Sequence, residues 1–166
     1  MTTRQFDITF DTILHRMTIR RAFDAGRQLV WDCHTQSDLL DQWFAPKPLT
    51  TKTKVMNFTE GGLWHYAMVM PDGQEFWGRM DYQTISPIDG YTLLDGFCDA
   101  TGTLSPDMPR ARWDVSFKDA GARTLVETVV AYGSAAELEQ VIAMGMEAGM
   151  TSTLERLDEL LSTLVN

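Results

Sequence analysis

The sequence predicts an α+β fold in which a curved antiparallel sheet of six to seven strands wraps around one long C-terminal helix. Three observations predict it: two short helical segments follow the first strand-like segment, a run of strand-like segments with short turns follows them, and a Leu-rich helical segment ends the chain. Consecutive strands joined by short turns form an antiparallel meander. A terminal helix of roughly 30 residues needs a large apolar cover, and a curved sheet provides one.

The first third of the chain predicts strand structure followed by two short helices. Residues 6–22 are rich in Ile, Thr and Phe, and they indicate one long strand or two short ones. We expect Asp24 to cap a helix over 27–33 and Ser37 to cap a second helix over 38–44. Both helices are too short for a βαβ crossover.

The middle of the chain predicts a meander. Gly61 and Gly62 indicate a turn or bulge, Pro71 and Gly73 a tight turn, and the Gly- and Pro-containing residues 99–110 a long loop. The expected strands are 52–58, 63–70, 75–85, 91–98, 111–118 and 123–132.

The final segment, from Ser134 onward, has apolar residues spaced by three and four. This spacing predicts one helix, or two helices with a kink near Gly145 and Gly149. Glycine in a helix interior lowers helix stability relative to alanine, so the presence of two glycines requires a structural explanation. One explanation is close approach of the helix to the sheet, or the kink itself. The other is that the missing side chains leave room for a ligand.

Alternation along the strands predicts which side chains face the concave side of the sheet, because successive residues of a strand point to opposite faces. These side chains are aromatic or Met-rich, and an adaptable apolar lining with a few polar groups is typical of a small-molecule site. The alternative is that they simply fill the core. The predicted ligand-binding residues are Trp64, Tyr66, Met68, Met80, Tyr82, Phe97, Trp113, Met146, Gly149 and Met150.

Composition limits the classes of partner. The length of 166 residues favours a single domain spanning 1–166. The net charge of −9 argues against binding to nucleic acid or to an anionic membrane surface. The chain shows neither a signal peptide nor an apolar run long enough to insert into a membrane, and its two cysteines, Cys33 and Cys98, suggest free thiols. We therefore expect a cytoplasmic protein.

No catalytic or metal-binding pattern is visible. His15, His34 and His65 lack metal-ligand spacing, and we expect neither a metal nor another cofactor. His15 falls in the first strand segment, and the alternation places His65 on the solvent side. Arg79 and Asp81 are expected to form a weak ion pair on the outer face, beside Trp77. The alternative, if the two faces are reversed, is that Arg79 faces the pocket and holds a ligand carboxylate. An exposed tryptophan often marks an interface, so the sequence also allows a homodimer.

The chain resembles the activator of heat-shock protein 90 ATPase homologue-like family, within the START/Bet v 1-like (SRPBCC) superfamily of helix-grip folds. The resemblance covers nearly all of the chain after about residue 15. The matching residues are Arg21, Phe23, Ala25, Val30, Trp31, Trp43, Phe44, Pro46, Gly61, Gly62, Trp64, Tyr66, Met68, Pro71, Asp72, Gly73, Gly78, Ile85, Pro87, Gly145, Gly149, Leu154 and Leu157.

The resemblance implies a cavity between the sheet and the long helix, and binding of lipid-like, apolar or amphipathic small molecules in many members. It also implies co-chaperone activity in eukaryotic namesakes, which carry a second domain that this sequence does not show. It carries over no catalytic residue. We expect a ligand-binding protein, with a polyketide cyclase or dehydratase-like enzyme and a co-chaperone-type interaction module as alternatives. A polar pocket residue with a perturbed pKa would favour the enzyme.

Overall fold

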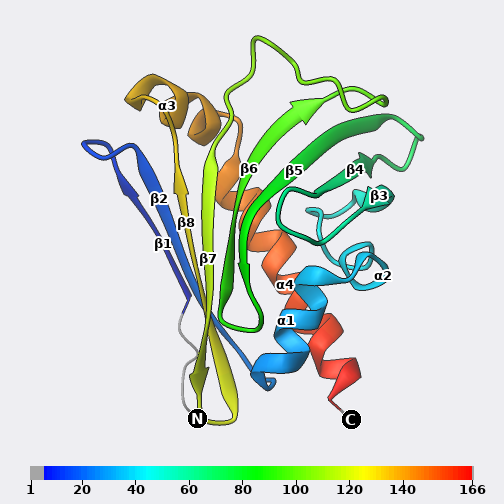
Figure 1. Ribbon diagram of the computed structural model, residues 1–166, viewed down its shortest axis with the longest axis vertical. Coiled ribbons are helices and arrows are strands. Elements are labelled where there is room, and N and C mark those ends of the chain that lie inside the picture. Colours follow the sequence, from blue (N-terminus) through cyan, green and yellow to red (C-terminus); the bar gives the residue numbers. More distant parts are fainter. Residues whose placement is uncertain (1–5, 166) are drawn as a thin grey trace.

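The computed structural model describes residues 6–165, which form one eight-stranded antiparallel sheet packed on helices (Figure 1). The strand order is β1-β2-β8-β7-β6-β5-β4-β3. The strands are β1 (Phe6–Asp11), β2 (Arg16–Phe23), β3 (Thr50–Met56), β4 (Leu63–Val69), β5 (Glu75–Ser86), β6 (Gly90–Cys98), β7 (Arg112–Ala120) and β8 (Arg123–Ala131). The helices are α1 (Arg27–Thr35), α2 (Ser37–Leu40), α3 (Ala135–Ala143) and α4 (Met146–Leu164). The predicted helix-grip fold is confirmed, with one strand more than the upper expected number.

The additional strand comes from a hairpin within residues 6–22. The Asp11 carboxylate accepts hydrogen bonds from the backbone N–H groups of Ile13 and Leu14, both at 3.0 Å. His15 then takes a positive φ of 56° and lies in the turn, not in a strand as expected. β1 pairs with β2, and β2 pairs with β8, so the hairpin extends the meander at one edge.

Both predicted helix caps are wrong. Gly26 precedes α1 without a side-chain cap, while Asp24 accepts a hydrogen bond from Arg123 Nε at 2.7 Å across to β8. Ser37 is the first residue of α2 and caps nothing, and α2 ends at Leu40 instead of continuing to residue 44. Asp24 forms an ion pair with Arg123, and the connection between α1 and α2 is short. Neither helix therefore has the side-chain cap that was expected.

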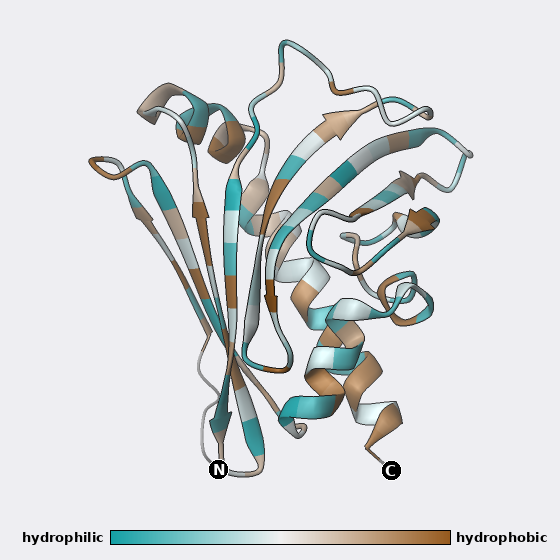
Figure 2. Cartoon of the chain, viewed as in Figure 1, coloured by the Kyte–Doolittle hydropathy of each residue, from teal (hydrophilic) through white to brown (hydrophobic). Residues whose placement is uncertain are grey.

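Two bulges strengthen the curvature of the sheet. The register shifts between Thr53 and Val55 in β3, and between Tyr82 and Thr84 in β5. Bulges bend a strand and increase its twist. The strands therefore curve over α4, which crosses the concave side with α1 beside its C-terminal half (Figure 1). Figure 2 shows hydrophobic and hydrophilic bands alternating along the strands, as expected for one covered and one wetter face.

The terminal helical segment is divided in two. Ser134 caps α3 by accepting a hydrogen bond from the Glu137 N–H, as the position of this serine suggested. Gly145 then takes a left-handed conformation, with φ of 88°, and starts α4 in a new direction. Non-glycine residues pay a steric cost in this conformation, so Gly145 is explained by the break between the helices.

Candidate ligand-binding cavity

Two adjoining chambers lie between α4 and the concave face of the sheet. The outer chamber has a volume of about 320 Å³ and the inner one about 40 Å³. Phe44, Met80, Trp113 and Met150 line both chambers, so these side chains form the boundary between them. Met80 and Met150 are unbranched and flexible, which makes this boundary adaptable.

The outer chamber is predominantly apolar and opens to solvent. Three of its lining side chains are well exposed: Phe76 at 48%, Phe97 at 41% and Met144 at 55%. The lining also carries five methionines, a density suited to ligands of variable shape. These are Met68, Met80, Met144, Met146 and Met150. Strands β4, β5 and β6 supply one wall, and the α3–α4 junction supplies the other.

Asp95 is an acidic group on the wall of this apolar chamber. Its carboxylate accepts hydrogen bonds from the Ala111 N–H at 2.7 Å and from Trp113 Nε1 at 2.8 Å. Burial raises the pKa of Asp95, while these two donors and the charge of Arg110 partly oppose the rise. Asp95 therefore fixes the Trp113 indole at the boundary between the chambers and adds a polar group to the outer one.

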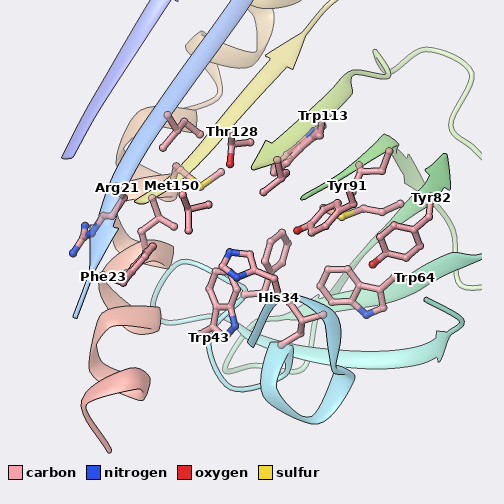
Figure 3. A pocket seen from close by; sticks show the side chains of 18 residues that line it. Arg21, Phe23, His34, Trp43, Trp64, Tyr82, Tyr91, Trp113, Thr128 and Met150 are labelled. Carbon is pink, nitrogen blue, oxygen red and sulfur yellow. The ribbon is translucent and has the colours of Figure 1, made fainter. Parts of the chain in front are cut away.

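The inner chamber is smaller and less open than the outer one, and several polar groups line it. Its walls include Leu40, Trp43, Trp64 and Leu93, each at most 2% exposed. The polar side chains on this lining are Arg21, His34, Tyr82, Tyr91 and Thr128. Figure 3 shows the hydroxyl ends of Tyr82 and Tyr91 turned toward the side of the chamber that His34 occupies.

His34 is a neutral base at the inner chamber. The ring lies in the last turn of α1, with centroids 5.0 Å from both Trp43 and Phe117. Burial lowers its pKa to about 4, although the hydrogen bond to the Val30 carbonyl opposes this shift. The carbonyl oxygen can only accept, so His34 Nδ1 donates to it at 2.8 Å, and Nε2 of the neutral ring carries a lone pair.

All ten residues selected from the sequence line one of the chambers or both. Trp64 and Tyr82 border the inner chamber, and Tyr66, Met68, Phe97, Met146 and Gly149 border the outer one. Met80, Trp113 and Met150 border both. Their contact with a ligand stays a prediction.

The sequence did not identify His34, Asp95, Tyr91 or Thr128 as lining residues. Strand alternation offered a signal for Tyr91 and Asp95, which share the parity of Phe97 in β6. Thr128 likewise shares the parity of the buried Val126 and Val130 in β8. His34 had no such signal, because it lies on a helix whose orientation depends on tertiary packing.

Gly149 leaves space in the outer chamber. Among the described residues, a Cβ atom built on Gly149 would meet only Pro46 Cγ outside the backbone of its own helix, at 3.9 Å, which is an ordinary contact. Close approach to the sheet therefore does not explain this glycine. The two glycines have separate reasons: Gly145 makes the break between α3 and α4, and Gly149 adds volume to the chamber.

His65 was expected to face solvent, but it is buried on the convex face, at 5% exposure. The loop after β6 covers it, with His65 Nε2 3.0 Å from the Asp99 carbonyl and its ring 4.9 Å from the Trp77 ring. Trp77 also lies 5.7 Å from Lys54 Nζ, so this tryptophan packs within the convex face and is only partly exposed.

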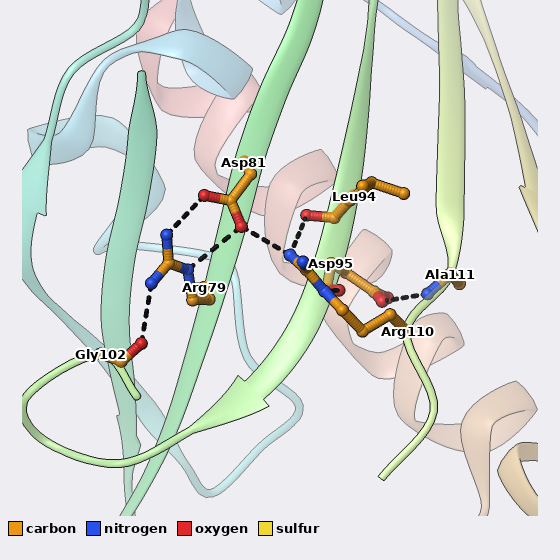
Figure 4. Close-up of polar contacts among 7 residues, drawn as sticks. All are labelled: Arg79, Asp81, Leu94, Asp95, Gly102, Arg110 and Ala111. Atoms are coloured by element: carbon orange, nitrogen blue, oxygen red, sulfur yellow. Dashed lines mark hydrogen bonds and ion pairs between the residues drawn. The ribbon is translucent and has the colours of Figure 1, made fainter. Parts of the chain in front are cut away.

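Arg79 and Asp81 lie on the convex face as expected, but in a denser network than a weak surface pair (Figure 4). Arg79 donates to Asp81 at 2.6 Å and to the Gly102 carbonyl at 2.7 Å, and Arg110 also donates to Asp81. Burial alone would raise the pKa of Asp81, but the two guanidinium groups outweigh it and hold that pKa below its usual value. The network holds the loop over β5 and β6.

Within residues 6–165, no three His, Cys, Asp or Glu side chains are grouped as a metal site requires. Over the same residues, no helix combines the length and the apolar character needed to cross a bilayer.

Comparison with solved structures identifies close structural relatives. Protein Ms6760 from Mycobacterium smegmatis is 25% identical, with a TM-score of 0.87 over 96% of this chain and 97% of that one. A protein from Arthrobacter aurescens is 27% identical, with a TM-score of 0.89 over 95% and 91%. The crystal structure of DynU16, from the dynemicin biosynthetic locus, shares the fold at 15% identity, with a TM-score of 0.62 over 90% of this chain and 48% of that one.

A search among curated proteins found no significant match. The family model described as "Activator of Hsp90 ATPase homolog 1-like protein" matches residues 24–162, which include both helices before β3, strands β3 to β8 and nearly all of α4. The chain therefore belongs to the activator of Hsp90 ATPase homolog 1-like family.

Proposed function

We propose that this protein binds a small apolar or amphipathic molecule in the cavity between the sheet and α4. The observation that carries the proposal is the outer chamber, an apolar space of about 320 Å³ that opens past exposed Phe76, Phe97 and Met144. Pockets of this size and character are typical small-molecule sites. The eight strands form one sheet over α4, which supports one domain with one cavity.

The Gly149→Leu variant tests this proposal. The leucine side chain would project into the outer chamber, where, outside the backbone of α4 and among residues 6–165, only Pro46 lies near the Cβ position. We expect it to hold or raise the melting temperature and to abolish binding of the apolar fluorophore N-phenyl-1-naphthylamine. Glu155→Leu is the matched control, because it adds the same side chain at an exposed position of α4. Unchanged fluorophore affinity in a stable Gly149→Leu protein would exclude a ligand at this position.

A reaction on the bound molecule is the second candidate, and Asp95 and His34 favour it. Both lie on the cavity wall, and both have pKa values that burial has shifted. Perturbed titratable groups in a cavity are typical of catalytic sites. A ligand recovered from the protein would then change mass on prolonged incubation with the wild type, and not with Asp95→Asn.

The co-chaperone alternative and a homodimer receive less support. A filled core with an exposed apolar surface would favour an interaction module, whereas this fold has an open apolar chamber. The convex Trp77, which suggested an interface, packs on His65 and Lys54.

A further inference from the structure

Four polar atoms on the inner chamber have no hydrogen-bond partner in residues 6–165. They are His34 Nε2 and the hydroxyl oxygens of Tyr82, Tyr91 and Thr128. Every fully enclosed polar side-chain atom of the described chain does have a partner. These four atoms therefore border open space, and the inner chamber is that space (Figure 3).

Polar groups that line an apolar chamber without a partner lose part of their hydration, so a polar group from outside the chain is expected to complete their hydrogen bonding. A cavity needs about 10–15 Å³ of this kind of volume to hold one water molecule. The chamber, at about 40 Å³, is large enough for a water molecule or for the end of a ligand, and too small for a whole ligand.

The hydrogen-bonding character of the chamber requires a group that both donates and accepts. His34 Nε2 offers only a lone pair, because Nδ1 carries the proton. Burial raises the pKa values of Tyr82 and Tyr91, so both phenols stay protonated and can donate. A hydroxyl group satisfies both requirements at once.

The charge of the chamber requires a neutral group. Arg21 contributes its stem to the lining, while its guanidinium points away from the chamber (Figure 3) and lies 3.9 Å from Asp158. An ionised carboxylate would lose its hydration at this site without gaining a counter-charge.

We propose that the inner chamber binds a neutral hydroxyl group at one end of the ligand, while the apolar body of the ligand lies in the outer chamber. The shared lining by Phe44, Met80, Trp113 and Met150 lets one molecule extend through both spaces. This inference rests on the proposed function and adds the chemical class of the ligand.

The isomers 1-nonanol and methyl octyl ether test the inference, because only the alcohol can donate to His34 Nε2. Both should displace N-phenyl-1-naphthylamine, and the alcohol should bind about three- to tenfold more tightly. Nonanoate at neutral pH should bind more weakly than the alcohol. The Tyr82→Phe/Tyr91→Phe variant should weaken the binding of 1-nonanol about three- to tenfold.

The control is Thr84→Val/Thr92→Val, which removes two hydroxyl groups that lie outside both chambers. It should leave the affinity for 1-nonanol unchanged. Equal binding of alcohol and ether by the wild type would overturn the inference while the proposed function stands. A loss of alcohol affinity in the control variant alone would also overturn it. Failure of the wild type to bind the fluorophore or either isomer would overturn both.

Nitrogen NMR of the wild type supplies a measurement that needs no variant. The signal of His34 Nε2 should move on addition of 1-nonanol and stay in place on addition of the ether. Movement of that signal to the same extent with both isomers would overturn the inference.

Discussion

His34 shows how the environment of a single side chain defines the inner chamber. Its ring is held between Trp43 and Phe117, and its Nδ1 is occupied by the Val30 carbonyl. Trp43 is held in turn, because its Nε1 donates to the Cys33 carbonyl at 2.8 Å. The orientation of the His34 ring is thus fixed before any ligand enters. The lone pair of Nε2 is then available to the ligand.

The buried histidine predicts a loss of stability in acid. Burial lowers the pKa of His34 from 6.5 to about 4, so in this interval the unfolded chain binds a proton that the folded chain does not. The free energy of unfolding therefore falls as the pH falls from about 6.5 to about 4. At about 1.36 kcal/mol per pKa unit, the contribution of this group is roughly 3 kcal/mol.

Urea unfolding of the wild type and of His34→Phe, compared at several pH values, measures this contribution. The stability difference between them should shift by roughly 3 kcal/mol against the wild type between pH 6.5 and 4, because only the wild type must bury a neutral imidazole. Carboxylates present in both proteins contribute equally to the pH dependence of both stabilities, so their contribution cancels in the difference. A difference that does not change with pH would show that His34 is free to protonate.

At the level of single residues, strand parity predicted more than any other sequence signal. It placed Trp64, Tyr82 and Trp113 on the concave side, where they line the chambers. It was wrong for His65, because solvent exposure of the convex face depends on the loop after β6. That loop is held by Arg79, whose side chain reaches the distant Gly102 carbonyl. Such a long-range contact leaves no periodic signal in the sequence.

At the level of elements, the α3–α4 junction combines two glycines with different roles. Gly145 has φ of 88°, whereas Gly149 lies within α4 and faces the outer chamber. The sequence predicted a kink near this pair but gave no means to separate the two roles. The backbone conformation and the empty space beside Gly149 separate them.

Alanine substitutions at the two glycines should change the stability of the protein in opposite directions. Gly149→Ala should stabilise the protein by about 0.5–1 kcal/mol, because alanine restricts the unfolded chain and its Cβ finds space. Gly145→Ala should destabilise it by about 1–2 kcal/mol, because a left-handed conformation is costly for alanine. Thermal and urea unfolding of both variants measure the two signs. Stabilisation by both substitutions would mean that α3 and α4 can form one continuous helix.

The hairpin of β1 and β2 matches the alternative of two short strands in residues 6–22, although the expected total of six to seven strands did not allow for both. Residues 6–22 contain neither glycine nor proline, so the sequence offers no breaker at the turn. The turn depends instead on the Asp11 carboxylate and on the positive φ of His15. Asp and His adopt or support such turns without forming a clear sequence pattern.

At the level of the whole molecule, the fold was predictable and the division of the cavity was not. Strand spacing, turn residues and the terminal helix predicted a curved sheet around α4, which the structure confirms. The separation into chambers depends on four side chains from different elements, Phe44, Met80, Trp113 and Met150. Their meeting point follows from sheet curvature and helix placement, which residue patterns do not specify.

The methyl signals of the methionines test most directly the claim that a small apolar molecule binds between the sheet and α4. Four of the five methionines that line the cavity are at least partly buried, namely Met68, Met80, Met146 and Met150, whereas the buried Met17 does not line it. In an NMR titration with N-phenyl-1-naphthylamine, the four lining signals should shift and saturate at one affinity, and Met17 should stay in place. Absence of saturable shifts at the lining methionines would contradict the account.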